Sequence, residues 1–403
     1  MSELAPAEEA EIAVAVLAAH DAGEPLLVFG NGSKAGFLRP VQAARSLSLR
    51  NHAGITLYSP KELVISARAG TAMQALEAEL ARQGQHVIAE PPDLSALLGP
   101  NGATSQTLGG VVATNLSGPR RVAWGAMRDH VLGIRAVNGQ GEVIRSGGRV
   151  LKNVTGLDLC KLLTGSYGTL AVLTEITLKV LPAPEAAGTV VLPGLDASGA
   201  VAAMSAALGS PYSVSAASWL PAEAAARVPE LAGFGASVTV ARIEDFAASV
   251  VYRTGRLRAD LAGFGSGEIL DDATSRAVWR AIGNARPLAV EAEEAIWRVS
   301  VRPSAGPDVM RAVGAIGGHS FLDWGGGLVW IAAPARESVH RAITTAARAA
   351  GGVWTLLRAP DALRAGLDVI PPEPASLAQI TRRVKAAFDP KGILNPGRMY
   401  AGV

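Results

Sequence analysis

The sequence predicts an α+β fold in two domains, and three observations carry this prediction. The chain has 403 residues, which is more than one ordinary hydrophobic core organises. Up to Val180, short apolar runs, one helical segment and further apolar runs follow one another, which is typical of helices combined with a largely antiparallel sheet. The segment LPAPEAAG, residues 181–188, is then interrupted by prolines, so we place a domain boundary between residues 183 and 184.

The first domain, residues 1–183, is expected to begin with an amphipathic helix at Pro6–Asp21, whose acidic residues come early, where the helix dipole favours them. Met73–Gly84 fits a second helix that ends at Gly84. Four strands are predicted in this part of the chain: Leu26–Gly30, Ser46–Arg50, Ile55–Pro60 and Glu62–Thr71. In the last of them, side chains alternate between inward and outward positions.

A hairpin is predicted next, because VLGIRAV (131–137) and EVIRSGG (142–148) flank the glycine-containing turn at 138–141. GSYGTLAVLTEITLKV, Gly165–Val180, then reads as a glycine turn that leads into an alternating strand. The second domain, residues 184–375, mixes helices with strands such as Trp297–Val301 and Gly327–Ala333. A last helix at Leu377–Phe388 and the tail DPKGILNPGRMY (389–400) form a third segment, residues 376–403.

Composition excludes several classes of function. The net charge of +2 gives no electrostatic basis for binding nucleic acid or an anionic membrane. The single cysteine, Cys160, excludes an internal disulfide and a cysteine-built metal centre, and we expect it to be a buried small apolar residue. None of the six histidines is paired at ligand spacing, so no protein-bound metal is expected.

The N-terminus is acidic and lacks the basic start of a secretory signal. No apolar run reaches the roughly 20 residues that a membrane span needs. We therefore expect a cytoplasmic protein with no direct membrane insertion.

The loop GNGSKAG, Gly30–Gly36, follows a buried strand, where backbone N–H groups can form an anion-binding nest. Ser33 adds a hydroxyl group and Lys34 a positive charge. A dinucleotide-binding βαβ unit is disfavoured because Pro40 follows soon and no helical period begins, and the loop does not match a Walker sequence. A tight turn between strands is the alternative.

The segment TLGGVVATNLSGPRR, Thr107–Arg121, is built of small residues that let the backbone approach a ligand closely. Its alternative is a glycine-kinked core strand packed against a helix. For Gly165–Val180 the alternative is an ordinary hairpin strand that follows a type II turn.

These three segments in this order, with Pro91-Pro92 between the first and the second, resemble the PCMH-type FAD-binding domain of the vanillyl-alcohol oxidase/p-cresol methylhydroxylase flavoproteins over Leu26–Val180. Together with SKAGFLRP, EPPD, LKNVTGLDLCKLLTGSYG, DWGGGL and DPKGILNPGRMY, they make the chain similar to the FAD-binding E subunits of bacterial glycolate oxidase (glycolate dehydrogenase). The resemblance implies a PCMH-type domain of two α/β subdomains, a smaller α+β cap, and a C-terminal segment that returns to the FAD-binding domain.

The resemblance also implies which residues hold FAD. The cofactor is expected to be non-covalent, because Gly30–Gly36 contains no His or Cys and Cys160 lies outside the segments that the family uses for linkage. The residues implied are Gly30, Asn31, Gly32, Ser33 and Lys34 at the pyrophosphate, Pro92, Thr107, Gly109, Gly110, Ala113, Thr114 and Asn115 in the cofactor wall, Val172 through its backbone, and Asn395 from the C-terminus. For Asn395, a plain Asn-Pro-Gly turn is the alternative.

The function implied is that of one FAD-binding subunit in a complex that oxidises glycolate to glyoxylate. Its partners would be a catalytic D-like flavoprotein subunit and an iron–sulfur subunit, through which the complex would contact a membrane. The flavin of this chain would then be an electron relay or a structural cofactor. Two alternatives stay open: a self-sufficient FAD-dependent oxidase or dehydrogenase of a 2-hydroxy acid, glycolate or D-lactate, and a non-enzymatic scaffold.

Catalytic candidates are few, since the chain lacks the HGDGN-type motif of the family's catalytic members. Arg298 could clamp a carboxylate, Asp323 lies beside glycines that admit a ligand, and His319 could act as a base. The alternatives are a buried Arg298–Asp323 pair within the second domain and a structural or solvated His319. Arg120 and Arg121 could neutralise FAD, contact a partner or be solvated.

Overall fold

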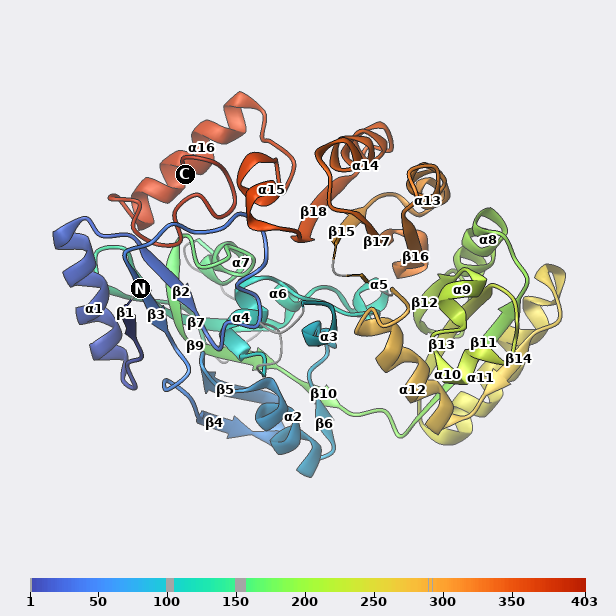
Figure 1. Ribbon diagram of the computed structural model, residues 1–403. Helices are drawn as coiled ribbons and strands as arrows, with labels where there is room; N and C mark the ends of the chain where they lie inside the picture. The colour runs from blue at the N-terminus through green and yellow to red at the C-terminus, as the bar shows by residue number, and fades with distance from the viewer. Residues whose placement is uncertain (1, 99–104, 149–156, 289, 292) are drawn as a thin grey trace.

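The computed structural model describes the chain except residues 1, 99–104, 149–156, 289 and 292. Two groups of elements lie side by side in Figure 1. One group, here called the N-terminal body, comprises the elements up to β10 together with the C-terminal helices α15 and α16. The other, here called the cap, comprises the strands β11 to β18 and their helices.

A three-stranded sheet opens the N-terminal body, and both of its strand pairs are parallel. Helix α1, which lies between the first two strands of this sheet along the chain, spans Glu9–Ala22 where Pro6–Asp21 was predicted. It starts with a capping box between Glu8 and Glu11 and ends at Gly23 in the left-handed conformation, φ 64°. The strands, in spatial order, are β1 (Ser2–Leu4), β3 (Arg45–Ser48) and β2 (Leu26–Phe29).

A five-stranded antiparallel sheet forms the rest of this body. Its strands, in spatial order, are β4 (Ile55–Ser59), β5 (Val64–Arg68), β9 (Ala171–Lys179), β7 (Val131–Asn138) and β8 (Val143–Gly147). The alternation predicted for Glu62–Thr71 and Gly165–Val180 is wrong, since consecutive residues of both β5 and β9 are buried. Neighbouring side chains of a strand point to opposite faces, so other segments cover both faces of this sheet. Helix α4 is one of them and contacts β5 and β9.

Local signals explain two further elements. Helix α2 ends at Arg82, two residues before Gly84, whose φ is 62°. In the β7–β8 hairpin, the Asn138 side chain accepts hydrogen bonds from the N–H groups of Gln140 and Glu142, and Gly141 takes a φ of 79°. The remaining elements of this part are η1 (Pro60–Glu62), α2 (Met73–Arg82), β6 (Gln85–His86), α3 (Ser95–Leu98), α4 (Leu108–Ala113), α5 (Arg121–Trp124), α6 (Met127–His130), α7 (Leu159–Leu163) and β10 (Leu181–Pro182).

The cap is an antiparallel sheet of eight strands covered by helices. Its strands, in spatial order, are β14 (Glu268–Leu270), β11 (Ala186–Pro193), β13 (Val238–Asp245), β12 (Val214–Leu220), β16 (His319–Asp323), β17 (Leu328–Pro334), β15 (Glu294–Ser300) and β18 (Val353–Arg358). Its helices are α8 (Ala197–Leu208), α9 (Ala222–Ala225), α10 (Pro229–Ala232), α11 (Ala247–Asp260), η3 (Ala262–Phe264), α12 (Asp272–Gly283), η4 (Pro303–Ala305), α13 (Gly306–Gly314), η5 (Trp324–Gly326) and α14 (Glu337–Ala349). The fully buried indoles of Trp279, Trp297 and Trp330 are among the largest side chains of its core.

After the cap, the chain returns to the N-terminal body through α15 (Asp361–Gly366) and α16 (Ala375–Phe388), which lie above β2 in Figure 1. The tail then adds a parallel bridge to β2: the Leu26 N–H donates to the Ile393 carbonyl at 2.7 Å and the Asn395 N–H donates to the Leu26 carbonyl at 3.0 Å. Buried Lys385 and Asp389 form an ion pair at 2.7 Å that holds the end of α16.

The α+β fold predicted from the sequence is confirmed, whereas the residue at which the domains divide stays a prediction. No helix in the described part of the chain is both long enough and apolar enough to cross a membrane.

Candidate functional site

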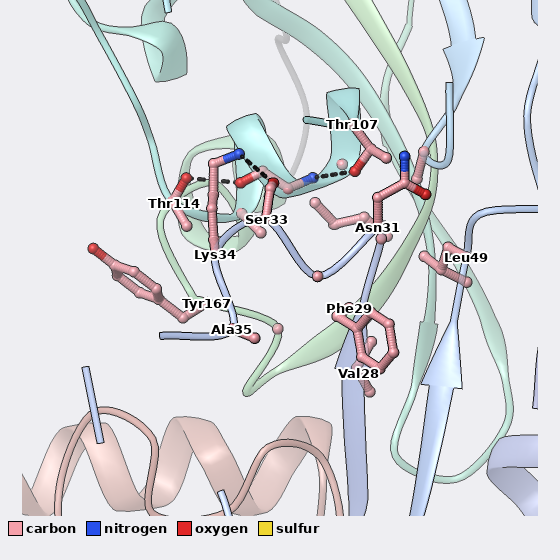
Figure 2. Close-up of a pocket in the computed structure, with 18 of the residues that line it drawn as sticks. Val28, Phe29, Asn31, Ser33, Lys34, Ala35, Leu49, Thr107, Thr114 and Tyr167 are labelled. Atoms are coloured by element: carbon pink, nitrogen blue, oxygen red, sulfur yellow. Dashed lines mark hydrogen bonds between the residues drawn. The ribbon is translucent and has the colours of Figure 1, made fainter. Parts of the chain in front are cut away.

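A slot of about 660 Å³ runs through the N-terminal body where β2, α4 and the start of β9 come together. Figure 2 shows Ser33, Lys34, Thr107 and Thr114 around the first helical turn of α4, with Tyr167 and Leu49 on opposite sides of the view. The lining residues are Val28, Phe29, Gly30, Asn31, Gly32, Ser33, Lys34, Ala35, Leu49, Ala69, Thr107, Gly109, Gly110, Ala113, Thr114, Tyr167, Gly168, Ala171, Leu173 and Arg398.

The loop after β2 contributes backbone to one wall of the slot. A Cβ atom on Gly30 would lie 2.1 Å from the Thr107 hydroxyl oxygen, so only glycine fits there. Gly32 adopts a φ of 78°, and its carbonyl accepts the Ala35 N–H at 3.0 Å. No helix follows the loop, in agreement with the prediction against a dinucleotide-binding βαβ unit.

The second wall is a short helix, so the alternative of a core strand at Thr107–Arg121 is wrong. Thr107 starts α4 because its hydroxyl accepts the Gly110 N–H at 3.2 Å. The helix lies tightly against β5: a Cβ atom on Gly109 would come within 2.8 Å of the Ala69 side chain. Small residues therefore bring the backbone of α4 close to both the slot and the sheet.

Two cations face the slot. Lys34 Nζ donates to the Gln106 side chain at 3.1 Å, and burial lowers the pKa of Lys34 to about 8, while the charge of Asp93 opposes this shift. Arg398 donates to the Lys34 carbonyl at 2.8 Å, and burial lowers its pKa to about 10. Among the described residues, neither cation forms an ion pair, and Arg398 Nε is buried with no partner. The slot is therefore suited to an anion such as a phosphate.

The turn Gly165–Gly168 forms the third wall and depends on left-handed backbone. Gly165, Tyr167 and Gly168 have φ angles of 88°, 54° and 70°. Asn395 supports this turn from the C-terminus, since its Nδ2 donates to the Tyr167 carbonyl at 2.9 Å. A plain Asn-Pro-Gly turn, the alternative for Asn395, does not account for this long-range bond.

Most residues that the resemblance implied lie in the slot. Those that line it are Gly30, Asn31, Gly32, Ser33, Lys34, Thr107, Gly109, Gly110, Ala113 and Thr114. Four others take different positions. Pro92 is buried between Pro91 and Asp93, which line a separate polar cavity. The Asn115 side chain accepts the Arg128 N–H at 2.9 Å, and Val172 is a buried β9 residue whose two neighbours line the slot. Asn395 does not line the slot but donates a hydrogen bond to the backbone of Tyr167, which does.

The sequence analysis missed Tyr167, Arg398 and the apolar residues Leu49, Ala69, Ala171 and Leu173. Tyr167 and Arg398 stand inside the motifs GSYG and NPGRMY, so the signal was present, but only the fold shows that both side chains reach the slot. Burial raises the pKa of the Tyr167 phenol, and Arg298 and Arg398 oppose this shift through their charges.

On the cap side, Arg298 does not pair with Asp323, so that alternative is wrong for the described residues. The Arg298 guanidinium packs on two indoles, 5.2 Å from the ring centre of Trp324 and 4.9 Å from that of Trp330. Asp323 instead accepts the Trp324 N–H at 2.7 Å, and burial raises the pKa of its carboxyl group to about 7.

His319 lies at the start of β16 and Asp323 at its end. His319 Nδ1 is 3.6 Å from the Glu294 carboxylate, which favours a structural role. No histidine of the described residues lines the slot. The described part of the chain also has no group of three His, Cys, Asp or Glu residues placed to hold a metal ion. Cys160 is buried, with its thiol 3.3 Å from the Ser146 carbonyl.

A network of buried charges joins the N-terminal body to the cap. Arg242 of β13 donates twice to Glu90, at 2.9 Å each, and Arg120 donates to Glu244 at 3.0 and 2.6 Å. Arg120 therefore has an ion-pair partner in the cap and does not face the slot. The network borders a polar cavity of about 1140 Å³ that Gln106, the partner of Lys34, also lines.

The slot fits FAD by three observations. Glycine backbone lies where a Cβ would collide, half-buried Lys34 and buried Arg398 supply positive charge for the phosphates, and Leu49, Ala69 and Leu173 form an apolar stretch for flat rings. Comparison with known proteins agrees. Residues 3–147 match the family model described as FAD binding domain, and residues 374–399 match the model described as FAD linked oxidases, C-terminal domain.

Among curated proteins, glycolate oxidase subunit GlcE of Escherichia coli (strain K12) is 35% identical over 381 residues, which cover 94% of this chain and 93% of that protein. A D-lactate dehydrogenase of Anaerostipes hadrus is 35% identical over 147 residues, or 36% of this chain and 29% of that protein. The solved structure of p-cresol methylhydroxylase with substrate bound superposes with a TM-score of 0.73 at 14% identity, covering 98% of this chain and 88% of that one. The PCMH-type fold and the FAD cofactor are thereby shown.

Proposed function

Because the chain belongs to the family of FAD-linked oxidoreductases that includes glycolate oxidase subunit GlcE, we propose that it is the FAD-binding relay subunit of a complex that oxidises glycolate to glyoxylate. In this proposal a D-like flavoprotein subunit removes the substrate's two electrons and two protons. This chain accepts the electrons and passes them to an iron–sulfur subunit. Any membrane contact of this cytoplasmic complex is made through those partners.

One observation carries the proposal: an elaborate flavin slot stands beside a cap from which no histidine reaches it, within the described residues. Oxidation of a 2-hydroxy acid needs a base for the hydroxyl proton. His319, the candidate base, is engaged with Glu294, and Asp323 is engaged with the Trp324 backbone. A relay needs the slot but not the base.

The residues of the chain have separable tasks in binding FAD. Lys34 and Arg398 neutralise the diphosphate, the Gly30–Gly36 backbone donates N–H groups to it, and Asn395 fixes the two segments on either side. Bound FAD supplies a redox group that takes up a hydride and releases electrons. We propose that it is held non-covalently by residues 1–183 and 376–403, with residues 184–375 as the cap.

The test is an anaerobic absorbance titration of the purified full-length chain with glycolate, before and after the D-like subunit is added. A yellow chain that stays oxidised until the D-like subunit is present supports the relay. Denaturation in acid should release all of the flavin into the supernatant. A colourless chain that still binds the D-like subunit would identify a scaffold instead.

A self-sufficient 2-hydroxy-acid dehydrogenase is a second candidate function, and one observation favours it: Arg298 has no ionic partner among the described residues. Bleaching of the flavin by glycolate in the isolated chain would establish this candidate and end the relay proposal.

A further inference from the structure

Arg298 belongs to a ladder of alternating cations and aromatic rings that crosses from the cap to the N-terminal body. Arg121 lies 4.6 Å above the Trp324 ring, Arg298 lies against the same ring and against Trp330, and Trp330 stacks on Phe321 with ring centres 6.3 Å apart. Two guanidinium groups therefore share one indole.

The two cations of this ladder lack counter-ions among the described residues, as does Arg398 in the slot, whereas three buried arginines have them. Arg242 and Arg120 each bind a carboxylate, and Arg364 binds Asp361. Among the described residues, Arg298 and Arg121 form neither an ion pair nor a side-chain hydrogen bond, and Arg298 Nε is buried with no partner. A guanidinium nitrogen that is shielded from water and has no partner is costly, so the Nε of half-buried Arg298 favours a site that an external anion completes.

The groups around Arg298 within the described residues do not supply that anion, so it would have to come from outside the chain. Burial, with a smaller contribution from the charge of Arg121, lowers the pKa of Arg298 to about 10, while Tyr167 and Asp323 oppose this shift. Asp323, whose charge acts on Arg298, is a weak counter-ion because burial raises its pKa to about 7, so much of it is protonated at neutral pH. Arg298, Arg121 and Trp324 are each only half-buried, so a small solute can reach them.

The loop that carries Trp324 is held in an unusual conformation. Trp324, Gly325 and Gly326 have φ angles of 53°, 67° and 100°. A tryptophan in the left-handed region is strained and persists only where the surroundings enforce it. Here the Trp324 indole N–H donates to the Gly118 carbonyl at 3.0 Å, which fixes the ring at the boundary of the two bodies.

The ladder lies next to the slot. Tyr167 lines the slot, and its phenol is close enough to Arg298 for each to influence the pKa of the other. In Figure 2 its hydroxyl group points to the left of the view, away from Ser33. Tyr167 therefore belongs both to the lining of the slot and to the surroundings of Arg298.

We propose that Arg298, with Arg121 on the other side of Trp324, forms a binding site for the carboxylate of a small 2-hydroxy acid in this subunit, with the Tyr167 hydroxyl as a further hydrogen-bond donor. A guanidinium group binds a carboxylate through two parallel N–H donors, and the flanking indoles restrict its orientation. The site is a property of this chain and does not depend on the D-like subunit. Only the choice of a 2-hydroxy acid among small carboxylates rests on the proposed function.

The test is ligand-observed NMR, by saturation transfer to the methylene protons of glycolate, with the full-length FAD-loaded chain under anaerobic conditions. Glycolate should bind saturably, and ethylene glycol, which lacks the carboxylate, should not. Sodium chloride and sodium sulfate at matched ionic strength should not displace glycolate; if they do, the site is a general anion site and the carboxylate assignment fails.

Arg298→Gln should weaken glycolate binding by at least about tenfold, because it removes the charge and the paired donors. Arg298→Lys keeps the positive charge but lacks the two parallel N–H donors, so its glycolate affinity should lie between those of the wild type and Arg298→Gln. The matched control is Arg348→Gln: Arg348 also stacks on a cap tryptophan, Trp354, at 5.2 Å, but it is exposed, and its loss should leave affinity within about twofold of the wild type.

Melting temperature and flavin content of each variant show whether it is folded. Unchanged glycolate affinity in a folded Arg298→Gln variant overturns the inference. If the D-like subunit still reduces the flavin of that variant, the relay proposal stands by itself. If wild-type chain binds glycolate but its flavin does not respond to the D-like subunit, the relay proposal fails and the site stands.

Discussion

Asn395 binds both polar backbone atoms of Val28, although 367 positions separate the two residues. The Val28 N–H donates to Asn395 Oδ1 at 2.8 Å, and Asn395 Nδ2 donates to the Val28 carbonyl at 3.2 Å. Since Asn395 Nδ2 also donates to the Tyr167 carbonyl, one buried amide ties the strand before the Gly30–Gly36 loop to the turn on the far side of the slot.

Asn395→Gly is expected to lower both the stability of the chain and its FAD content. Glycine accepts the φ of 42° at this position, so the variant isolates the lost side chain. Leaving two buried backbone groups of Val28 unpaired should cost about 1–3 kcal/mol each. Thermal melting and the flavin-to-protein ratio measure the effect. Asn51→Gly, at an exposed asparagine that bonds Ala5, is the control, and equal flavin ratios in the two variants would contradict the expectation.

Gly30→Ala should produce a chain that retains little FAD. The new methyl group would lie 2.1 Å from the Thr107 oxygen that caps α4, so the loop or the helix must move. Gly36→Ala in the same loop is the matched control, because nothing lies within 4 Å of its Cβ position. Equilibrium dialysis against FAD compares the two; wild-type affinity in Gly30→Ala would show that this close approach is not needed.

FAD affinity should fall as the pH rises through about 8, because the Lys34 ammonium must stay protonated to attract the diphosphate. In the FAD-free chain, burial sets the pKa of Lys34 below its usual value of 10.5, so the unfolded chain binds more protons between pH 8 and 10.5. FAD-free stability should therefore rise with pH across that window.

Lys34→Met should bind FAD more weakly and lose this pH dependence. The measurement is flavin fluorescence during titration with FAD from pH 7 to 9.5, values on either side of the Lys34 pKa of about 8. Lys61→Met, at an exposed lysine, should retain the wild-type profile. If the FAD affinity of Lys34→Met still falls above pH 8, a group other than Lys34 causes the pH dependence.

Arg242→Met should destabilise the chain by about 3–5 kcal/mol, because it leaves Glu90 and Glu244 without their shared cation in a buried site. Chemical denaturation measures the loss. Arg311→Met removes a pair with Asp308 whose side chains are 74% and 68% exposed, and it should change stability by no more than about 1 kcal/mol. Equal losses of stability in the two variants would show that the buried charge network does not hold the cap against the N-terminal body.

The same network of buried charges should make the stability of the chain fall at low pH. Burial by itself raises the pKa of Glu244, but Arg242 and Arg120 outweigh it and hold the pKa at about 2, below the usual 4.5. Its stabilisation is therefore complete above pH 4.5 and is lost as the pH falls from 4.5 towards 2. The loss in this window should be smaller in Arg242→Met than in the wild type, as circular dichroism during acid titration can show.

The sequence by itself determined the family, the cofactor and the α+β class. Those conclusions depend on short contiguous signals: glycines and small residues whose backbone demands are local, such as Gly30 in its loop and Thr107 as a helix cap. It erred where burial on two faces decides a pattern, as in β5 and β9. At α4 it left a core strand open as the alternative, which the Thr107 cap and the helix exclude.

Only the tertiary structure decided which side chains meet. Arg398, Tyr167 and Lys34 come from three distant segments, and no spacing along the chain brings Arg298 between Trp324 and Trp330. From the sequence, a buried Arg298–Asp323 pair within the second domain was the alternative to a carboxylate-binding role for these two residues. In the fold, the Asp323 carboxylate accepts the Trp324 N–H, and the Arg298 guanidinium packs on indole rings. Partner choice of this kind depends on register and on burial, which act through space and leave no local trace.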